Sequence, residues 1–365
     1  MKIAIISLYS RLGDKTGDVV QADKTADAIR ALGHNVVRGY FKPATSEIFD
    51  SKGGCLGTWL QVLGDRDVVH TIPPIPWKFV CKQPHIKAKF ACSTVFWRSY
   101  TYTRVLHKIG GHLTFALLKD YVRTMLAWLG IPTYMSYAGY DLLLPNSEDE
   151  IKCVKRYCRI KKGAKIVAVP NAIDPLPEYV DELPRSGLVP QEDYILVPGV
   201  FAARKNQLTF IRAMKGCEYP IVFIGDGPML AKCKSEATPT MVFLGHIAHG
   251  SKEFYSIMKH ARGVCLSSNC ETPGIAALEA AALGARPVVP HEGGTGQYYG
   301  WDAEYHDGIS EVSERNAIHK AWKRDRLSRI EMDHYRMCTW IECARRTVRA
   351  YLSATSDVAQ GGAYA

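Results

Sequence analysis

Short apolar runs alternate with segments of helical periodicity along most of the chain, and this alternation limits the fold more than any other feature. Strands that are buried on both faces read as continuous apolar runs, and helices between them indicate parallel pairing. We therefore expect an α/β protein built from doubly wound, Rossmann-like sheets. The strand candidates are KIAIISLY, NVVRGY, DVVHTI, KFACSTVF, DLLLPN and KIVAVPN in the first half, and YILVPGV, PIVFIGDG, TMVFLGHI, GVCLSS and RPVVP in the second.

A proline-rich polar stretch, NAIDPLPEYVDELPRSGLVPQED, separates these halves and indicates a domain boundary. We expect an N-terminal domain in residues 1–175 and a C-terminal domain in residues 190–335. Residues 336–365 are expected to form a C-terminal helix, which can pack back on the N-terminal domain, and a tail. Ligands of doubly wound sheets bind beyond the carboxyl ends of the strands, often at a domain interface. The two domains are therefore expected to face each other across a binding cleft.

The cysteines and the hydropathy exclude several classes of protein. No C-x-x-C pair occurs among the eleven cysteines, so neither a disulfide framework nor a zinc site is indicated. No run approaches the roughly 18 to 20 apolar residues that span a bilayer, and the N-terminal apolar stretch is too short for a signal peptide. We expect a cytoplasmic protein with reduced cysteines.

Two carboxylates, Glu271 and Glu279, interrupt the small and apolar segment CETPGIAALEAAALGARPVV. Because GVCLSS reads as a buried strand, Glu271 is expected in the loop at its carboxyl end and Glu279 about two turns into the next helix. Thr272 can cap this helix, and Pro273 suits its first turn. The alternative is a pair of solvated surface acids. The alanines favour a ligand instead, because they permit close approach and the free N–H groups at the helix start suit a phosphate.

This segment resembles the E-x7-E signature of the retaining nucleotide-sugar glycosyltransferases with the GT-B fold, in the large family numbered four. The segments LPNSEDE, VPNAID, VPGVFAARKNQLTFIRAM, FIGDGP, FLGHI and HEGGTGQ also follow the order found in that family. The likeness covers most of residues 140–300 and, more loosely, the first strand and helix. It implies an enzyme that moves a sugar from a nucleotide-diphosphate sugar, held by the C-terminal domain, to an acceptor hydroxyl, held by the N-terminal domain.

The resemblance also implies roles for particular residues. Glu271 would contact the donor sugar and Glu279 the ribose, while Arg204 and Lys205 would clamp the diphosphate, so that Glu271, Arg204 and Lys205 form the catalytic group. Two cations in this place stabilise the charge that develops on the leaving group. Cations at a helix start also oppose the helix dipole, which favours an anionic ligand. Further donor-binding residues are expected at Thr272, Pro273, Gly274, Ile275, Gly199, Gly225 and Gly13.

Enzymes of this kind retain the anomeric configuration by front-face attack, with the leaving phosphate as proton acceptor. The resemblance therefore implies no dedicated base, no cofactor and no required metal. Asp65 and Asp67 have the D-x-D spacing that holds a metal in another glycosyltransferase fold, but one such triplet before a strand is more typical of a turn. We assign no metal site.

The N-terminal half departs from the family pattern at two points. The loop SRLGDKTGD, which contains Gly13, lacks the usual adjacent glycines. After the strand in KFACSTVF, where the family commonly has a histidine near the transferred sugar, this chain has Phe96 and Trp97. These two residues and His70, in VVHTI, are the acceptor-side candidates. The alternative for His70 is a core histidine at a strand end.

Positive charge is concentrated in the first half. Residues 1–185 carry 26 Lys and Arg against 17 Asp and Glu, whereas the remainder carries 20 against 19. The segment KCVKRYCRIKKGAK, residues 152–165, interleaves seven cations with apolar side chains. It is either a solvated helix face or a contact for anionic lipid or nucleic acid. We expect an anionic or membrane-associated acceptor, first a lipid-linked or cell-surface glycan, and peripheral contact with the inner face of the membrane.

Other functions stay open at this point. A nucleotide-sugar epimerase can share the same architecture, and a modified nucleic-acid base is an alternative acceptor. A nucleic-acid-binding protein is suggested only by the basic half. An NAD-linked oxidoreductase is disfavoured, because GDGP lacks the third glycine of G-x-G-x-x-G.

Overall fold

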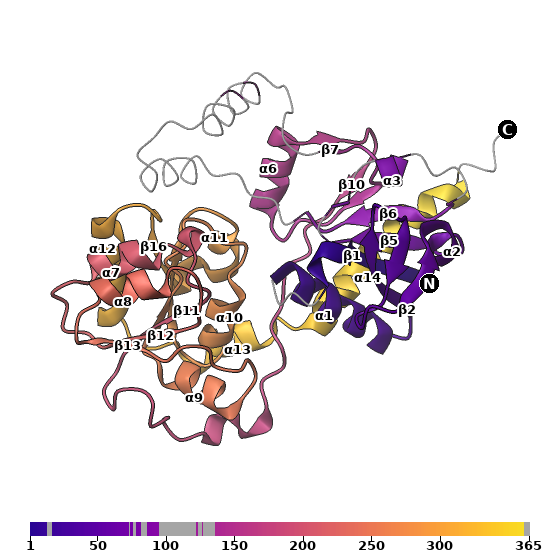
Figure 1. The fold of residues 1–365 in the computed structure, drawn as a ribbon. Coiled ribbons are helices and arrows are strands. Elements are labelled where there is room, and N and C mark those ends of the chain that lie inside the picture. Colours follow the sequence, from indigo (N-terminus) through magenta and orange to yellow (C-terminus); the bar gives the residue numbers. More distant parts are fainter. Residues whose placement is uncertain are drawn as a thin grey trace. The chain divides into compact units, whose positions relative to one another are not determined.

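A computed structural model of the chain describes residues 1–12, 17–72, 74–75, 78–81, 86–94, 122, 126 and 136–360. These residues fall into two compact units (Figure 1). Unit 1 takes the described residues up to Ala172, together with the chain from Thr339 onward. Unit 2 takes the segment Ile173–Cys338.

Unit 1 is built on a mostly parallel sheet. Across the sheet the strands are β10 (Lys165–Ile166), β8 (Leu142–Leu143), β6 (Lys89–Cys92), β5 (Val68–Thr71), β1 (Lys2–Leu8), β2 (Asn35–Lys42), β3 (Glu47–Phe49) and β4 (Cys55–Thr58). Only β2–β3 and β3–β4 pair antiparallel among these described strands. A separate parallel pair joins β7 (Ser136–Tyr137) and β9 (Arg159–Ile160). The helical elements are η1 (Tyr9–Arg11), α1 (Gly17–Ala31), α2 (Trp59–Leu63), α3 (Lys78–Cys81), α6 (Glu148–Tyr157) and α14 (Trp340–Gln360).

The C-terminal helix α14 belongs to unit 1, although unit 2 precedes it in the chain. It contacts α1. Ala344 and Tyr351 of α14 are buried in one apolar cluster with Ile3, Ile5 and Ala26. The helix therefore completes the core beside the central strand β1.

Unit 2 is built on a fully parallel sheet. Its strand order is β13 (Met241–Phe243), β12 (Ile221–Ile224), β11 (Ile195–Pro198), β14 (Gly263–Cys265), β15 (Arg286–Pro290) and β16 (Glu304–His306). The helical elements are η2 (Glu178–Glu182), η3 (Ala203–Lys205), α7 (Gln207–Ala213), α8 (Leu230–Glu236), α9 (Lys252–His260), α10 (Ile275–Ala281), α11 (Thr295–Tyr299), η4 (Gly300–Asp302), α12 (Glu311–Lys323) and α13 (Arg329–Arg336).

Both faces of this second sheet are buried, which explains why its strands read as continuous apolar runs. Successive side chains of a strand point to opposite faces. Ile195 and Val197 of β11 accordingly pack in a cluster with α7, α8 and α12, whereas Leu196 packs in a cluster with α9 and α10. The parallel sheet covered by helices that the sequence predicts is therefore confirmed in this unit.

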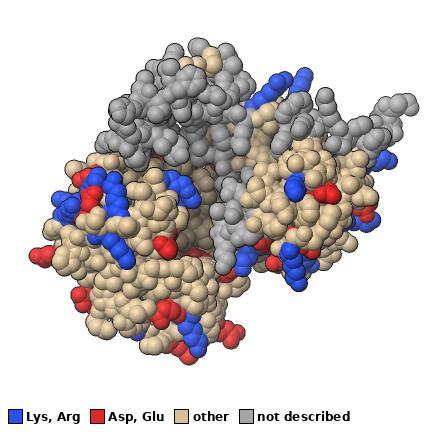
Figure 2. All heavy atoms as spheres, viewed as in Figure 1, with Lys and Arg blue, Asp and Glu red and all other residues tan. Residues whose placement is uncertain are grey.

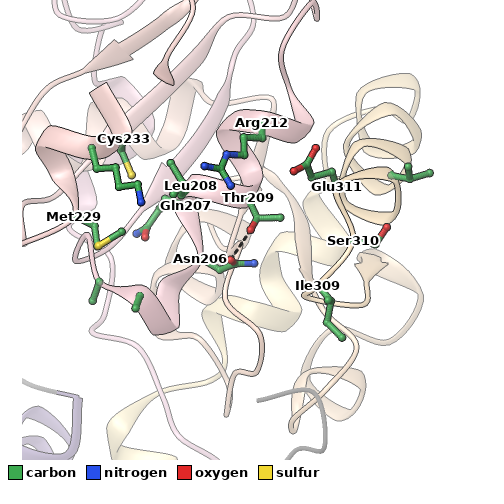
Figure 3. Close-up of a pocket in the computed structure, with 14 residues that line it drawn as sticks. Asn206, Gln207, Leu208, Thr209, Arg212, Met229, Cys233, Ile309, Ser310 and Glu311 are labelled. Carbon is green, nitrogen blue, oxygen red and sulfur yellow. Dashed lines mark hydrogen bonds between the residues drawn. The ribbon is translucent and has the colours of Figure 1, made fainter. Parts of the chain in front are cut away.

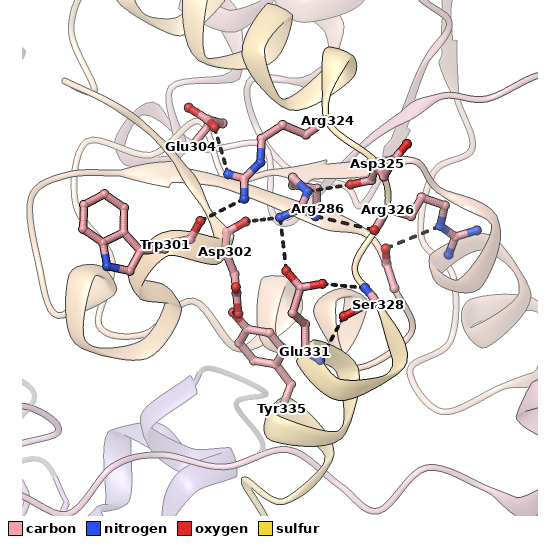
Figure 4. Close-up of polar contacts among 11 residues, drawn as sticks. Arg286, Trp301, Asp302, Glu304, Arg324, Asp325, Arg326, Ser328, Glu331 and Tyr335 are labelled. Atoms are coloured by element: carbon pink, nitrogen blue, oxygen red, sulfur yellow. Dashed lines mark hydrogen bonds and ion pairs between the residues drawn. The ribbon is translucent and has the colours of Figure 1, made fainter.

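A buried arginine ties α13 to the sheet of unit 2 (Figure 4). Arg286, at the start of β15, is 5% exposed and donates to the backbone oxygens of Asp302 and Asp325. It also lies 3.7 Å from the carboxylate of Glu331, and Tyr335 donates to the Asp302 carboxylate at 2.9 Å. Hydrogen bonds to a buried charge are strong, so this network fixes the last segment of unit 2 before the chain returns to unit 1.

Some structure lies outside what the sequence predicts. The antiparallel hairpin β3–β4 and the edge strand β16 are additional elements. The sequence leaves residues 176–189 between the two domains. In the structure Val180 and Val189 are buried in the core of unit 2, so this stretch packs with that unit.

The surface carries charges of both signs. On the face seen in Figure 2, Lys and Arg are interspersed with Asp and Glu over the described surface. Among the described helices, none combines the length and hydropathy needed to cross a membrane.

Candidate functional site

Glycines bring the loops that follow β11 and β12 into backbone contact. Gly199 and Gly225 have φ angles of +133° and +130°, and a Cβ on Gly225 would lie 2.1 Å from the Gly199 oxygen. A Cβ on Gly227 would lie 2.5 Å from the Phe201 oxygen. Only glycine fits such approaches without moving the backbone. Gly199 and Gly225, which we expected in the donor site, therefore allow the two loops to approach each other closely at the ends of β11 and β12.

The turn that carries the two predicted cations begins directly after this contact. Arg204 is exposed and Lys205 half-buried in η3, and Asn206 follows with a φ of +56° before α7 starts. Ser267, beyond β14, donates to the Lys205 backbone oxygen at 2.8 Å. Asn206 donates through its Nδ2 to the Gly308 oxygen at 3.2 Å. The cations thus lie on a 3-10 turn before α7, and this turn is hydrogen-bonded to two other loops.

Glu271 is held by the loop that follows β15. Its N–H donates to the Glu292 oxygen at 3.2 Å, and its oxygen accepts from the Gly294 N–H at 3.0 Å. Between them Gly293, with a φ of +117°, passes so close that a Cβ would lie 1.9 Å from the Glu271 oxygen. The HEGGT segment therefore positions the backbone of Glu271, and the Gly294 N–H is already used for this purpose.

Lys205 and Glu271, two of the predicted site residues, form a half-buried ion pair. Lys205 Nζ lies 2.5 Å from Glu271 Oε1, with the two side chains 19% and 11% exposed. Ser268 donates to the same carboxylate oxygen. Burial by itself raises the pKa of Glu271, but the charge and hydrogen bond of Lys205, with Ser268 and Arg204, lower it below its usual value. The carboxylate is thus ionised and is not a solvated surface acid.

Glu279 is buried in α10, where it meets a histidine that sequence reasoning did not select. Its side chain is 7% exposed, and its Oε1 lies 2.7 Å from Nε2 of His249. The His249 ring packs near Phe254, with ring centroids 4.8 Å apart. The second carboxylate of the E-x7-E segment therefore also has a basic partner from a separate loop.

The start of α10 differs from the prediction. The helix begins at Ile275 with Gly274 as its N-cap, and neither Thr272 nor Pro273 is part of it. Gly274 has a φ of +82°, and a Cβ there would lie 2.2 Å from Leu266. Tyr299 donates to the Pro273 and Gly274 oxygens. The predicted cap by Thr272 is wrong because the chain must pass close to Leu266 before the helix can start.

His70, the acceptor-side candidate in β5, has the environment of a core histidine. It is 1% exposed, with Nδ1 2.6 Å from the Tyr351 hydroxyl and Nε2 2.9 Å from the Ser93 hydroxyl. Burial lowers its pKa to about 3, so it is neutral. Because both nitrogens are used inside unit 1, His70 offers none to an acceptor. Gly13, Phe96 and Trp97 lie outside the described residues.

The basic segment 152–165 spans α6, β9 and the turn that leads to β10. Its apolar side chains face inward, since Val154 and Cys158 belong to the core of unit 1 and Cys153 is buried. The cations Lys152, Lys155, Arg156, Arg159, Lys161 and Lys162 are exposed. Any contact of this segment with an anionic surface is therefore electrostatic and does not involve insertion of an apolar face.

One cluster of conventional metal ligands occurs among the described residues, formed by Cys265, His306 and Glu314 within 4.8 Å of one another. His306 Nδ1 accepts from the Gly308 N–H at 3.1 Å, so Nε2, 2.9 Å from the Leu266 oxygen, carries the proton. Neither nitrogen keeps a free lone pair. A metal would have to break one of these bonds, so the arrangement does not fit a metal centre as it stands.

Sequence reasoning missed His249 and Ser268. Ser268 lies at the end of the strand candidate GVCLSS, and its proximity to Glu271 could have suggested it. His249 is separated from Glu279 by 30 positions. The signal available for His249 was its place after the strand TMVFLGHI, at the same edge of the sheet.

Comparison with known proteins shows which protein family most of unit 2 matches. Residues 181–313 match the family described as Glycosyl transferases group 1. This match covers the chain from η2 to the start of α12, and so includes all the predicted residues of unit 2. Among curated protein sequences, none matches the chain.

Solved structures resemble the whole chain at low sequence identity. The lipopolysaccharide outer core galactosyltransferase WaaB is 13% identical, with 97% of this chain and 99% of that chain covered and a TM-score of 0.68. Sucrose-phosphate synthase from Thermosynechococcus elongatus is 14% identical, with 99% of this chain and 98% of that chain covered and a TM-score of 0.61. Anabaena HepE in complex with UDP and glucose is 13% identical, with 99% of each chain covered and a TM-score of 0.56.

These likenesses establish the fold, and the family match establishes the class of the second unit. The fold class and the enzyme class that the sequence predicted are both confirmed. The chain is a glycosyltransferase with the GT-B fold, and residues 181–313 are its group 1 domain.

Proposed function

We propose that this glycosyltransferase moves a sugar from a nucleotide-diphosphate sugar to an acceptor hydroxyl with retention of anomeric configuration. The observation that carries this proposal is the half-buried pair of Lys205 and Glu271, which joins loops at the carboxyl ends of the adjacent strands β11 and β14. A buried ion pair contributes little net stability, because desolvation offsets the attraction. A pair at the ligand-binding edge of a sheet is better explained by a charged ligand that engages both partners.

Donor binding exchanges the partners of this pair. The diphosphate takes Lys205, with Arg204 beside it, and so releases Glu271 to accept hydrogen bonds from the hydroxyls of the donor sugar. Glu279 accepts from the ribose hydroxyls through Oε2, while His249 holds Oε1. HepE in complex with UDP-glucose and starch synthase IV in complex with ADP are similar to this chain, which supports a nucleotide in this place.

Transfer then needs no side chain that acts as a nucleophile. The bond between the anomeric carbon and the phosphate oxygen breaks, and the acceptor oxygen forms its bond to that carbon on the same face. The acceptor proton passes to the departing phosphate oxygen. Lys205 and Arg204 stabilise the negative charge on the leaving diphosphate, and Glu271 lies beside the sugar on which positive charge develops. This scheme requires no metal.

Unit 1 is proposed to bind the acceptor. The exposed cations of residues 152–165 support an acceptor that is anionic or lies on an anionic membrane, with a lipid-linked or cell-surface glycan favoured. Sedimentation with vesicles of phosphatidylglycerol should show binding that falls steeply with salt. Binding of an RNA oligonucleotide in place of the vesicles would favour the nucleic-acid alternative.

The donor is tested by thermal unfolding of the full chain with UDP-, GDP-, ADP- and TDP-sugars, because a ligand that binds the folded state raises the melting temperature. One nucleotide class should raise it, and Lys205→Ala should reduce the rise. Products formed from the donor alone distinguish a transferase from an epimerase, since an epimerase converts the sugar without an acceptor. A flat response to every nucleotide sugar would contradict the proposal.

A further inference from the structure

A cavity of about 600 Å³ lies in unit 2, and Lys205, Glu271 and Glu279 are not among its lining residues. Figure 3 shows the residues that line it. This volume falls within the range of small-molecule sites. Its walls come from the η3 turn, α7, α8 and the start of α12. The lining residues are Ala202, Ala203, Asn206, Gln207, Leu208, Thr209, Arg212, Met229, Lys232, Cys233, Ile309, Ser310, Glu311 and Val312.

The cavity contains a buried amide that lacks one partner. Gln207 is 3% exposed, and its Nε2 donates to the Val200 oxygen at 2.9 Å. Its Oε1 has no hydrogen-bond partner among the described residues. Buried polar groups are normally paired, so a ligand that donates a hydrogen bond would satisfy this oxygen, for which the described residues provide no donor.

The charges around the cavity are nearly balanced. Arg212 is committed to Glu236 through two hydrogen bonds of 2.7 Å. The Lys232 ammonium and the Glu311 carboxylate are exposed and make no hydrogen bond or ion pair with the described residues. One free cation and one free anion attract a polyanion only weakly. The cavity therefore suits a neutral ligand that can both donate and accept hydrogen bonds.

The remaining lining residues add hydroxyl and apolar groups. Ser310 accepts from the Ser313 N–H, which leaves its own proton to donate. Met229, Ile309 and Val312 supply apolar surface, and Val312 is 69% exposed. A sugar ring combines hydroxyls at its edge with an apolar C–H face, and it matches this mixture.

We propose that this cavity binds a neutral saccharide unit, at a site separate from the donor site. Gln207 and Glu311 accept from its hydroxyls, and Lys232 and Ser310 donate to them. The backbone oxygens of the wall residues Ala202 and Ala203 accept hydrogen bonds from the N–H groups of Lys205 and Asn206, at 2.9 and 3.2 Å respectively. An occupant therefore contacts the turn that carries Lys205. Any effect on turnover rests on the proposed function, but binding at the cavity does not.

The test is calorimetric titration of the full chain, without donor, using maltose, cellobiose and lactose. At least one should bind saturably. Lys232→Ala combined with Glu311→Ala should weaken it about tenfold, because hydrogen bonds to charged groups are lost. Val312→Trp should block it by filling the cavity from an exposed position. Lys234→Ala, on the same helix but outside the cavity, is the matched control and should bind like the parent.

Glu271→Gln separates the two sites and should retain saccharide binding. The proposal is overturned if no disaccharide binds, or if the cavity variants bind like the parent. It is also overturned if Glu271→Gln alone abolishes binding, since the sugar would then occupy the donor site. Binding of inorganic phosphate that the cavity variants lose would overturn the assignment of a neutral ligand.

Discussion

The two units use polar side chains at the carboxyl ends of their strands in different ways. In unit 1, the neutral His70 is saturated by Tyr351 and Ser93, which come from α14 and from the residue after β6. In unit 2, Lys205 and Glu271 bring opposite charges together from two loops. The first arrangement joins distant segments of the chain through fixed hydrogen bonds, whereas the second consists of groups that a charged ligand can separate.

This difference shows why burial alone does not identify a site. His70 is buried and Glu271 is half-buried, and both have shifted pKa values. Burial is the cause for His70, and it favours the neutral form. For Glu271 the charge and hydrogen bond of Lys205, together with Ser268 and Arg204, outweigh burial and favour the charged form. A buried group kept ionised by a partner on another loop is the better candidate for ligand binding.

The largest expected effect is on turnover in unit 2. Lys205→Ala should lower the rate of sugar transfer about 100- to 1,000-fold, because it removes a preorganised cation from the leaving group. The assay is release of nucleoside diphosphate in the presence of acceptor. Lys215→Ala, an exposed lysine of the same unit, is the control. A rate within about twofold of the parent for Lys205→Ala would break the proposed contrast between the units.

The matching change in unit 1 should affect stability instead. His70→Ala should lower the free energy of unfolding by about 2 to 4 kcal/mol, since it leaves a cavity and unpaired hydroxyls. Tyr351→Phe, which removes one hydrogen bond, should cost about 1 kcal/mol. Both are measured by denaturant unfolding, with nucleotide affinity unchanged. Lost transfer in a fully stable His70→Ala protein would instead support the acceptor-side role.

A third group, Glu314, belongs neither to the His70 cluster nor to the Lys205–Glu271 pair, and it makes the stability of the protein depend on pH. Glu314 is 1% exposed, and its Oε1 has no partner among the described residues. Burial, with Asp307 and Glu311 nearby, raises the pKa of Glu314 well above its usual value. The folded state therefore holds a proton that the unfolded state releases above its lower pKa. The resulting stability is present at low pH and is lost as pH rises through the folded-state pKa.

Between the unfolded-state pKa of a glutamate and the raised folded-state pKa, this group should lower the free energy of unfolding by up to about 1.4 kcal/mol for each unit that the pH rises. Glu314→Gln should remove that slope, and Glu314→Leu should remove it and also stabilise the protein. Denaturant unfolding at a series of pH values from about 5 to about 9 measures both. Parallel pH profiles for the parent and Glu314→Gln would show that Glu314 is not protonated in the folded state.

The smallest expected effect concerns His249. His249→Ala should raise the KM for the donor about three- to tenfold with little change in kcat, because Glu279 loses the bond that orients it. His249→Gln can keep that bond and should recover part of the loss. A lower KM in His249→Ala would indicate that the histidine competes with the ribose instead.

Much of the fold could be predicted because buried parallel strands have a distinctive sequence pattern. The runs YILVPGV and PIVFIGDG became β11 and β12, each buried along its length. The hairpin β3–β4 was missed because Cys55 and Leu56 are exposed and no apolar run marks the second strand. The edge strand β16 has only three residues, too few for a recognisable pattern.

The candidate site was predictable only in part. Glu271 and Glu279 stood out because acids are unusual among alanines. Their partners could not be read in the same way, since Lys205 and His249 meet them across separate loops. Glu314 reads as an ordinary helix-face acid, and only the packing of α12 shows that it is buried.

The central claim is that Lys205 is shared between Glu271 and the donor diphosphate. It is tested most directly by calorimetric titration of UDP, GDP and ADP, which carry no sugar, into the parent, Lys205→Ala and Glu271→Gln. The account predicts changes of opposite sign for the nucleotide that binds. Lys205→Ala weakens it about tenfold, while Glu271→Gln strengthens it because the competing carboxylate is gone. Equal weakening by both substitutions, or no change in Lys205→Ala, would contradict the account.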